Sequence, residues 1–128
     1  MNLLLDTHLL IWVSSMPEQL SSEALSLLQN PEHKLCFSAV NLWEISIKRG
    51  LGRQDFRVDP SLLHRGLIEN GYTELVVKSF HCIALEQLPA IHTDPFDRML
   101  VAQAVSEGML LLTSDSVVAK YSGPIKLV

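Results

Sequence analysis

The 128-residue chain has few of the features that stabilise or export small secreted proteins. It contains only two cysteines, Cys36 and Cys82, which lie in apolar settings and lack the spacing of metal ligands. We interpret them as buried free thiols in a reducing compartment. The first residues also lack the positively charged start of a signal peptide, and Asp6 follows at once. Together these absences predict a cytoplasmic location.

Long apolar runs and an excess of positive charge are absent as well. No uncharged stretch reaches the roughly 18 residues that a membrane span needs, so we expect no membrane partner. The chain has 10 basic and 14 acidic residues, which give a formal net charge of -4. Because nonspecific nucleic-acid binding depends on Lys and Arg neutralising phosphates, this balance argues against a protein that packages nucleic acid.

Short apolar runs alternate with stretches of helical period. The runs predict strands at Leu3–Leu5, Leu35–Phe37, Glu74–Val77, Met109–Thr113 and Ile125–Val128. The periodic stretches predict helices at Ser22–Leu28, Val40–Lys48, Pro60–Glu69, Phe80–Leu88 and Pro95–Glu107. Strands that are apolar throughout are typical of a parallel sheet covered on both faces. We therefore predict one α/β domain over residues 1–128, with the polar stretch Gly50–Asp59 as a surface loop.

Acidic residues follow the predicted strands at the edge where parallel sheets bind ligands. Asp6 and Asp115 come directly after two of the strands. Asp97 lies in the first turn of the helix that Asp94 opens, and Glu44 lies one turn inside the helix after the second strand. We expect these acids to converge above the sheet. Clustered carboxylates repel one another unless a cation is shared, and their oxygens suit Mg²⁺ or Mn²⁺.

Each acid also has a purely structural interpretation. Asp is a preferred N-cap residue, so Asp6, Asp94 and Asp115 fit the starts of helices. Glu44 precedes Lys48 by four residues, the favoured order for a surface ion pair. The four acids taken jointly favour a site for a hard cation. Zinc is disfavoured because the five histidines are scattered and lack ligand spacing.

Several motifs occur in an order that resembles a known protein family. They are Asp6-Thr7-His8, Ser38-Ala39-Val40, Trp43-Glu44-Ile45, His92-Thr93-Asp94-Pro95-Phe96-Asp97-Arg98 and Thr113-Ser114-Asp115. The chain resembles PIN-domain proteins of the VapC toxin type nearly end to end. The resemblance implies a PIN-like nuclease domain with metal-dependent endoribonuclease activity, acting as the toxin of a type II toxin-antitoxin pair.

The resemblance also implies which residues carry the chemistry. The expected catalytic and metal-binding set is Asp6, Glu44, Asp97 and Asp115, with Mg²⁺ or Mn²⁺ as the cofactor. Asp6 and Asp97 are the expected main ligands. The expected neighbours of this set are Thr7, Ser38, Thr113 and Asp94. A cation held there would activate a water molecule for attack on a phosphodiester and stabilise the leaving oxygen.

Contacts with an RNA substrate are expected along a basic edge. Four basic residues follow closely on Glu44, and Arg98 follows Asp97; the candidates are Lys48, Arg49, Arg53, Arg57 and Arg98. Such residues position an RNA backbone without reading its sequence. A solvated polar loop would show the same pattern, so both interpretations stay open here.

The resemblance further implies a cognate antitoxin and a homodimer. The apolar residues after Asp6, among them Leu9, Leu10, Trp12 and Val13, are expected to exceed what a single core buries. Two other functions remain open: a non-catalytic PIN-like module that binds RNA or protein, and a magnesium-dependent phosphatase. The phosphatase is disfavoured because its motif needs a second Asp where this chain has His8.

Overall fold

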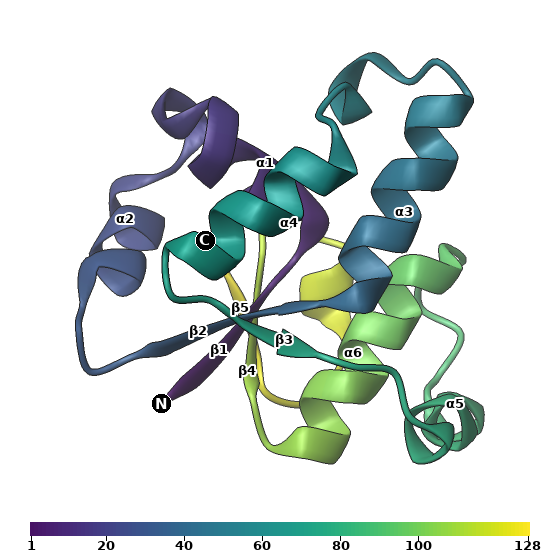
Figure 1. Ribbon diagram of the computed structural model, residues 1–128. Helices are drawn as coiled ribbons and strands as arrows, with labels where there is room; N and C mark the ends of the chain where they lie inside the picture. The colour runs from purple at the N-terminus through teal and green to yellow at the C-terminus, as the bar shows by residue number, and fades with distance from the viewer.

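Five parallel strands form the centre of the fold, with helices packed on both sides (Figure 1). The computed structural model describes all residues, 1–128. The strands are β1 (Asn2–Leu5), β2 (Lys34–Ser38), β3 (Thr73–Leu75), β4 (Leu110–Thr113) and β5 (Ile125–Leu127). The α-helices are α1 (Thr7–Ser15), α2 (Ser22–Gln29), α3 (Ala39–Gly50), α4 (Pro60–Glu69), α5 (Ser79–Ala84) and α6 (Pro95–Glu107). The predicted α/β class with a parallel sheet is confirmed.

Alternating side chains of the strands build two separate hydrophobic cores. Leu3 and Leu5 of β1 face the core beneath α1, α2 and α4, whereas Leu4 faces the core beneath α6. All three side chains are fully buried. Successive residues of a strand point to opposite faces, so an unbroken apolar run requires cover on both. Helix α3 contributes to both cores, through Ile45 on one side and Val40 on the other.

The strand order β3-β2-β1-β4-β5 places a topological switch point between β1 and β4. The chain builds one half of the sheet from β1 to β3 and then crosses over to β4 on the far side of β1. Connections therefore leave β1 and β4 in opposite directions, which opens a crevice at their carboxyl ends. Asp6 follows β1 directly and Thr113 ends β4, so both lie at this crevice.

The helix boundaries follow local chemistry. The bounds predicted for α4 and α6 are confirmed, because each begins with an Asp cap followed by Pro at the first helical position. Gly108 ends α6 in the left-handed conformation, with φ of 66°. Helix α1 was not among the predicted helices, since its apolar residues run almost without interruption. Strand β3 lies slightly earlier than predicted, and α5 gives way to a 3-10 turn at Leu85–Gln87.

Three expectations about burial are confirmed only in part. Cys82 is exposed on α5, although Cys36 is buried as expected. The stretch Gly50–Asp59 is not simply a surface loop, because a 3-10 turn folds Phe56 fully into the core. Of the apolar residues after Asp6, Leu9 and Leu10 are fully buried, whereas Trp12 and Val13 are only partly buried, so the expected apolar surplus is limited to the latter two. None of the helices combines the length and the apolar character needed to cross a membrane.

Two glycines at helix ends provide a matched test of backbone conformation. Gly108 has a positive φ, whereas Gly50 is helical, and an added Cβ would meet no atom at either position. Gly108→Ala should therefore destabilise the protein by about 1–2 kcal/mol. Gly50→Ala should be neutral or stabilise it by up to about 1 kcal/mol. Urea unfolding followed by circular dichroism measures both, and equal effects would contradict the assignment of the left-handed cap.

Candidate metal centre

The predicted acids meet in one small pocket at the carboxyl ends of β1 and β4. The pocket has a volume of about 200 Å³ and none of its lining residues is hydrophobic. It is lined by Asp6, Thr7, His8, Glu44, Lys48, Arg53, His92, Asp94, Asp97 and Asp115. All four expected metal-binding acids therefore lie together, with Asp94 as a fifth carboxylate. The five carboxylates lie on four different segments of the chain. The parallel topology brings these segments to one edge of the sheet.

Asp6 is held rigidly at the switch point. Its Oδ1 accepts the amide of Leu9 at 3.0 Å, which makes it the N-cap of α1. Its Oδ2 accepts the Thr113 hydroxyl at 2.7 Å and the Ser114 amide at 3.0 Å. Burial raises the pKa of Asp6, although these three hydrogen bonds oppose the rise. The capping interpretation is thus correct, and the same carboxylate also lines the pocket, since a carboxylate oxygen has more than one lone pair.

Glu44 is almost completely buried, and a chain of hydrogen bonds fixes its position. The Thr7 hydroxyl donates to Glu44 Oε1, and the Asn41 side-chain amide donates to Thr7 Oγ1 at 3.0 Å. Asn41 also contacts the carbonyl of Leu5, at 3.3 Å. Thr7 therefore contacts a site residue directly, as expected. A buried carboxylate needs such donors because an unpaired buried charge is strongly destabilising.

Lys48 lies inside the acidic pocket rather than along an RNA-binding edge. Its side chain is only 15% exposed. Its ammonium is 2.6 Å from Glu44 Oε2 and 3.0 Å from Asp94 Oδ2, so it joins α3 to the start of α6. Burial by itself lowers the pKa of Lys48, but the hydrogen bonds and charges of these two acids outweigh it, and the pKa is raised. The interpretation of Glu44 and Lys48 as a surface pair is wrong, because both side chains are largely buried.

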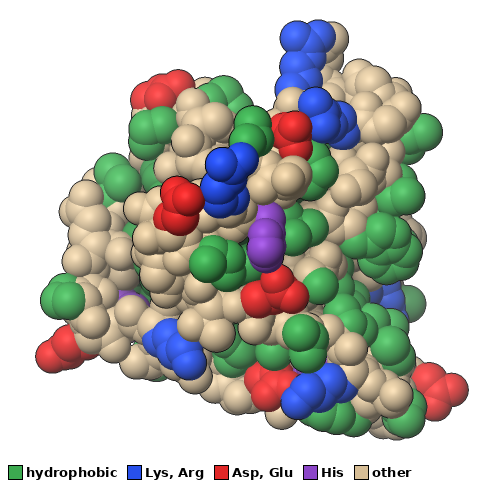
Figure 2. All heavy atoms as spheres, viewed as in Figure 1, with side chains coloured by type: hydrophobic (Ala, Val, Ile, Leu, Met, Phe, Trp, Pro, Cys, Tyr) green, Lys and Arg blue, Asp and Glu red, His purple; other side chains and the backbone are tan.

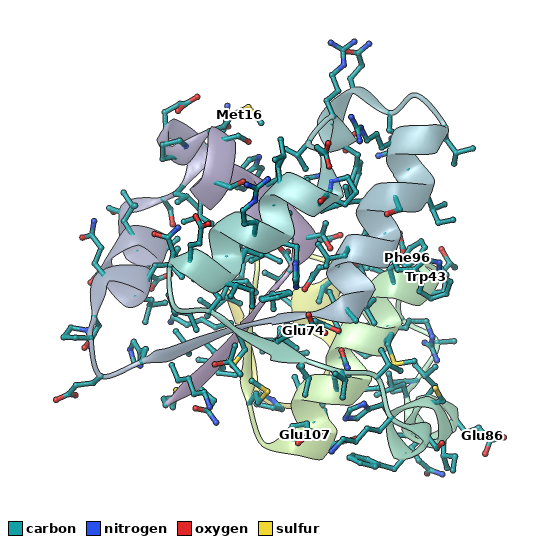
Figure 3. All side chains as sticks on the ribbon, viewed as in Figure 1. Met16, Trp43, Glu74, Glu86, Phe96 and Glu107 are labelled. Atoms are coloured by element: carbon teal, nitrogen blue, oxygen red, sulfur yellow. The ribbon has the colours of Figure 1, made fainter.

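Helices α3 and α6 are fastened together by an aromatic contact beside the pocket. Figure 3 shows Trp43 and Phe96 side by side, and their ring centroids are 4.9 Å apart at an interplanar angle of 80°. Edge-to-face geometry of this kind is the favoured arrangement of aromatic pairs. The residues that follow these rings are Glu44 and Asp97. The contact therefore brings the two helical acids of the site to the same pocket.

The pKa of Asp97 is raised, as is that of Asp6. Burial raises the pKa of Asp97 first, and the charges of Asp94, Glu44 and Asp6 add to the rise, which reaches a pKa of about 8. Asp97 is therefore mostly protonated at neutral pH when no cation is bound. Its neighbour Asp94 behaves in the opposite way: burial raises the pKa, but Lys48 outweighs burial and holds the pKa below its usual value. A divalent cation would relieve the repulsion between these carboxylates directly.

His92 lines the pocket, although it was not among the residues predicted for the site. Its Nε2 is 3.2 Å from Asp97 Oδ2 and 3.3 Å from Asp115 Oδ2. Its Nδ1 accepts the backbone N–H of Asp94 at 3.1 Å, so Nδ1 carries no proton. The neutral ring then has its proton on Nε2, where it donates toward the two carboxylates. The motif spacing from His92 to Asp97 was the signal that could have revealed this.

The other predicted residues divide between the pocket and the scaffold. Thr113 donates directly to Asp6, whereas Ser38 is fully buried and donates to Gln103 Oε1 at 2.6 Å. Ser38 also caps α3 and does not line the pocket. It acts on the site only through the start of the helix that carries Glu44.

The predicted basic residues do not form one edge. Arg53 lines the pocket and pairs with Asp55 at 3.0 Å, whereas Arg49 and Arg57 are exposed outside the pocket lining. Arg98 donates to the carbonyls of Pro89 and Leu85 and to the Tyr121 hydroxyl, which ties down the loop before α6. Because these contacts engage its guanidinium, the structure gives Arg98 a structural position.

The donor set fits a hard divalent cation. Asp97 and Asp115 group with His92, and Asp97 also groups with Glu44 and Asp94; within each group the potential ligand atoms lie within 4.8 Å of one another. Carboxylate oxygens dominate both groups, and these are the donors that Mg²⁺ and Mn²⁺ prefer. The raised pKa of Asp97 is consistent with this, because burial and then the charges of the neighbouring acids both disfavour its ionised form when no cation is present.

Comparisons with known proteins agree with this geometry. Ribonuclease VapC22 of Mycobacterium tuberculosis is 25% identical over 121 residues, which is 94% of this chain and 92% of that protein. Two solved complexes share the fold. One is VapBC2 from Rickettsia felis bound to a DNA fragment from its promoter, with a TM-score of 0.72, 11% identity and coverage of 99% of this chain and 98% of that one. The other is DNA-bound VapBC from Salmonella typhimurium, with a TM-score of 0.66, 18% identity and coverage of 98% and 97%.

A family model adds a match that spans almost the whole chain. The model is described as the PIN domain, and it matches residues 3–124. The matched range contains all five carboxylates of the pocket. The chain therefore belongs to the PIN domain family.

Proposed function

We propose that this protein is a metal-dependent endoribonuclease and the toxin of a VapBC-type toxin-antitoxin pair. The observation that carries the proposal is the convergence of five carboxylates in a pocket without hydrophobic lining. Membership of the PIN domain family supports a nuclease, and the similarity to Ribonuclease VapC22 supports RNA as the substrate. The acidic pocket also explains how a chain of net charge -4 acts on a polyanion, because the cation provides the positive charge at the point of cleavage.

The pocket residues have distinct roles in this proposal. Asp6, Asp97 and Asp115 would hold Mg²⁺ or Mn²⁺. When bound, the cation supplies activation of the attacking water and neutralises charge on the phosphodiester. Glu44, fixed by the Thr7 hydroxyl, would be the carboxylate that accepts a hydrogen bond from the attacking water. His92 orients the carboxylates of Asp97 and Asp115 through its Nε2–H.

RNA would approach the pocket past Arg53. This side chain is half exposed and is the only arginine in the pocket lining. A single arginine at the rim provides local attraction for a phosphate without making the whole surface basic. His8 lies beside it, with Nε2 3.1 Å from Asp55 Oδ2. The same geometry argues against the phosphatase alternative, because the position two residues after Asp6 has no acid.

The acids of the pocket can be tested with isosteric amides. Asp6→Asn and Asp97→Asn should each lower RNA cleavage with Mg²⁺ or Mn²⁺ by more than about 100-fold, because each removes a charged ligand. Excess EDTA should abolish cleavage by the unaltered protein. Glu86→Gln is the matched control, since Glu86 is exposed and lies far from α3 in Figure 3. Cleavage sites are mapped by sequencing the ends of a mixed RNA pool.

Two results of this experiment would contradict the proposal. Full activity of Asp6→Asn would exclude Asp6 from the chemistry, and cleavage that survives EDTA would exclude a metal mechanism. Circular dichroism on each variant shows whether the fold is intact. The non-catalytic alternative predicts that the unaltered protein binds RNA and leaves it uncut under every metal condition.

Cation binding should release a proton from Asp97. The pKa of Asp97 is about 8, so at neutral pH a cation must displace the proton in order to bind the carboxylate. We expect Asp97→Asn to release about one proton fewer than the unaltered protein. The difference should vanish well above the pKa, where Asp97 is already ionised. Calorimetric titration with Mn²⁺ in buffers of different ionisation enthalpy measures the release, and equal release by both proteins would contradict the role of Asp97.

An antitoxin would occupy the large apolar groove between α1, α2 and α4. The groove has a volume of about 690 Å³, and nine of its 15 lining residues are hydrophobic. Its lining includes Val13, Leu25, Leu28, Leu62 and Leu67. Apolar grooves of this kind accept the apolar face of a helix or an extended peptide. The VapBC complexes among the structural neighbours support an antitoxin as the occupant.

The groove can be tested by introducing a charge. Leu62 is 59% exposed at the groove, so Leu62→Asp should fold normally and lose a co-expressed antitoxin. Ile83→Asp is the control, because Ile83 is 67% exposed on α5 outside the groove. Size-exclusion chromatography of the co-expressed pair reports the complex. Retention of the antitoxin by Leu62→Asp, or its loss from both variants, would place the interface elsewhere.

The homodimer stays a prediction from the family resemblance. The outer side of α3 carries exposed hydrophobic residues that a second copy can cover, namely Trp43, Ile47 and Leu51. Figure 2 shows hydrophobic side chains along this flank of the molecule. These residues differ from the ones after Asp6 that the sequence interpretation proposed, of which Leu9 and Leu10 are buried in the protein's own core and Trp12 and Val13 are partly buried.

A further inference from the structure

Lys48 is the one ammonium group inside the acidic pocket. It comes from α3, one turn after Glu44, and reaches across to Asp94 at the start of α6. Two aromatic rings form the walls around it: its Nζ lies 4.9 Å from the centre of the Phe56 ring and 5.5 Å from that of Phe96. Phe56 is fully buried and Phe96 nearly so. The ammonium is therefore held by charge, hydrogen bonds and aromatic faces together.

The pocket has two halves that share Asp97. One half groups Asp97 with Asp115 and His92, and the other groups it with Glu44 and Asp94. Lys48 contacts two of the three acids in the second half and none in the first. The acids of the first half are paired only with a neutral histidine and backbone amides. The Lys48 ammonium thus compensates the Glu44 and Asp94 side alone, and Arg53, the other cation of the lining, pairs with Asp55.

An ordinary surface ion pair does not explain this arrangement. Exposed pairs contribute little because water screens them. Here the Glu44 side chain is 4% exposed and that of Lys48 is 15% exposed, and the ammonium bridges two acids from different helices. A divalent cation could enter this half only by breaking both hydrogen bonds and placing its charge beside the ammonium. The geometry thus makes the second half a poor site for a metal ion while Lys48 is present.

We propose that Lys48 is a built-in cation that takes the place of a second metal ion, so that the protein binds a single divalent cation at the Asp97 and Asp115 half. This inference rests on the proposed metal-dependent function and specifies how the site is divided. Lys48 is a positioning residue: it keeps Glu44 and Asp94 charged and in place. The Lys48 ammonium then compensates the negative charge of Glu44 and Asp94 at all times. The negative charge of Asp97 and Asp115 is compensated only when a cation is bound.

The inference is tested by counting bound Mn²⁺ in equilibrium dialysis. The unaltered protein should bind one Mn²⁺. Lys48→Met, which keeps the length of the side chain and removes the charge, should bind two. Lys48→Arg should restore a stoichiometry of one, because it returns the positive charge. Arg49→Met removes one positive charge from the neighbouring exposed position and should leave the stoichiometry at one.

Chemical labelling tests the inference on the unaltered protein, so its result does not depend on whether a variant folds. Lys48 should stay protected from amine acetylation both without Mn²⁺ and at saturation, as measured by mass spectrometry. Exposed Lys120 should react in both conditions. Acetylation of Lys48 that appears only with Mn²⁺ would show that the metal displaces the ammonium, and it would overturn the inference.

The possible results of the dialysis distinguish a failure of the proposed role of Lys48 from a failure of the proposed metal-dependent function. Two Mn²⁺ bound by the unaltered protein, or one bound by Lys48→Met with unchanged affinity, would overturn the role of Lys48 and leave a metal-dependent nuclease intact. No Mn²⁺ bound by the unaltered protein would overturn both proposals. One Mn²⁺ in the unaltered protein and two in Lys48→Met would support the inference.

Discussion

Mutual repulsion among five carboxylates in one pocket shapes the structure around that pocket. Each acid is compensated in a different way. Asp6 receives three hydrogen-bond donors, and Glu44 receives the Thr7 hydroxyl and the Lys48 ammonium. Asp97 has no cationic side chain within hydrogen-bonding distance, and burial together with the neighbouring acids raises its pKa to about 8. A cation bound beside it would favour the ionised form.

The sheet topology supplies the rigidity that such a site needs. Asp6 and Thr113 are anchored at the switch point by neighbouring central strands, and Asp6 Oδ2 accepts directly from Thr113. The helical acids depend instead on side-chain packing, because the Trp43 and Phe96 rings set how α3 lies against α6. The apolar groove between α1, α2 and α4 is lined by none of the pocket residues, so the acidic pocket and the groove are separate surfaces.

Much of this architecture was predictable because it depends on local patterns. Apolar strands such as Leu3–Leu5 predict a parallel sheet, and the Asp-Pro starts of α4 and α6 mark their first residues. The acids after β1 and β4 were predictable for the same reason, since parallel strands end at one edge. Helix α1 was missed because a helix buried on most sides has no polar face to reveal its period. Phe56 was missed because one apolar residue in a polar stretch does not show which core receives it.

The sequence by itself determined the fold class, the family and the four acids that carry the proposed chemistry, because residue type and order are enough for each. Only the tertiary structure decided what Lys48 and His92 contact. Both depend on distances between segments far apart in the chain, such as α3 and the loop before α6. The sequence left open whether Lys48 lies on an RNA-binding edge or in a solvated loop, whereas the packing of α3 against α6 turns its ammonium into the pocket. The order of residues alone does not show where the Lys48 side chain points, because its direction depends on how α3 and α6 pack against each other.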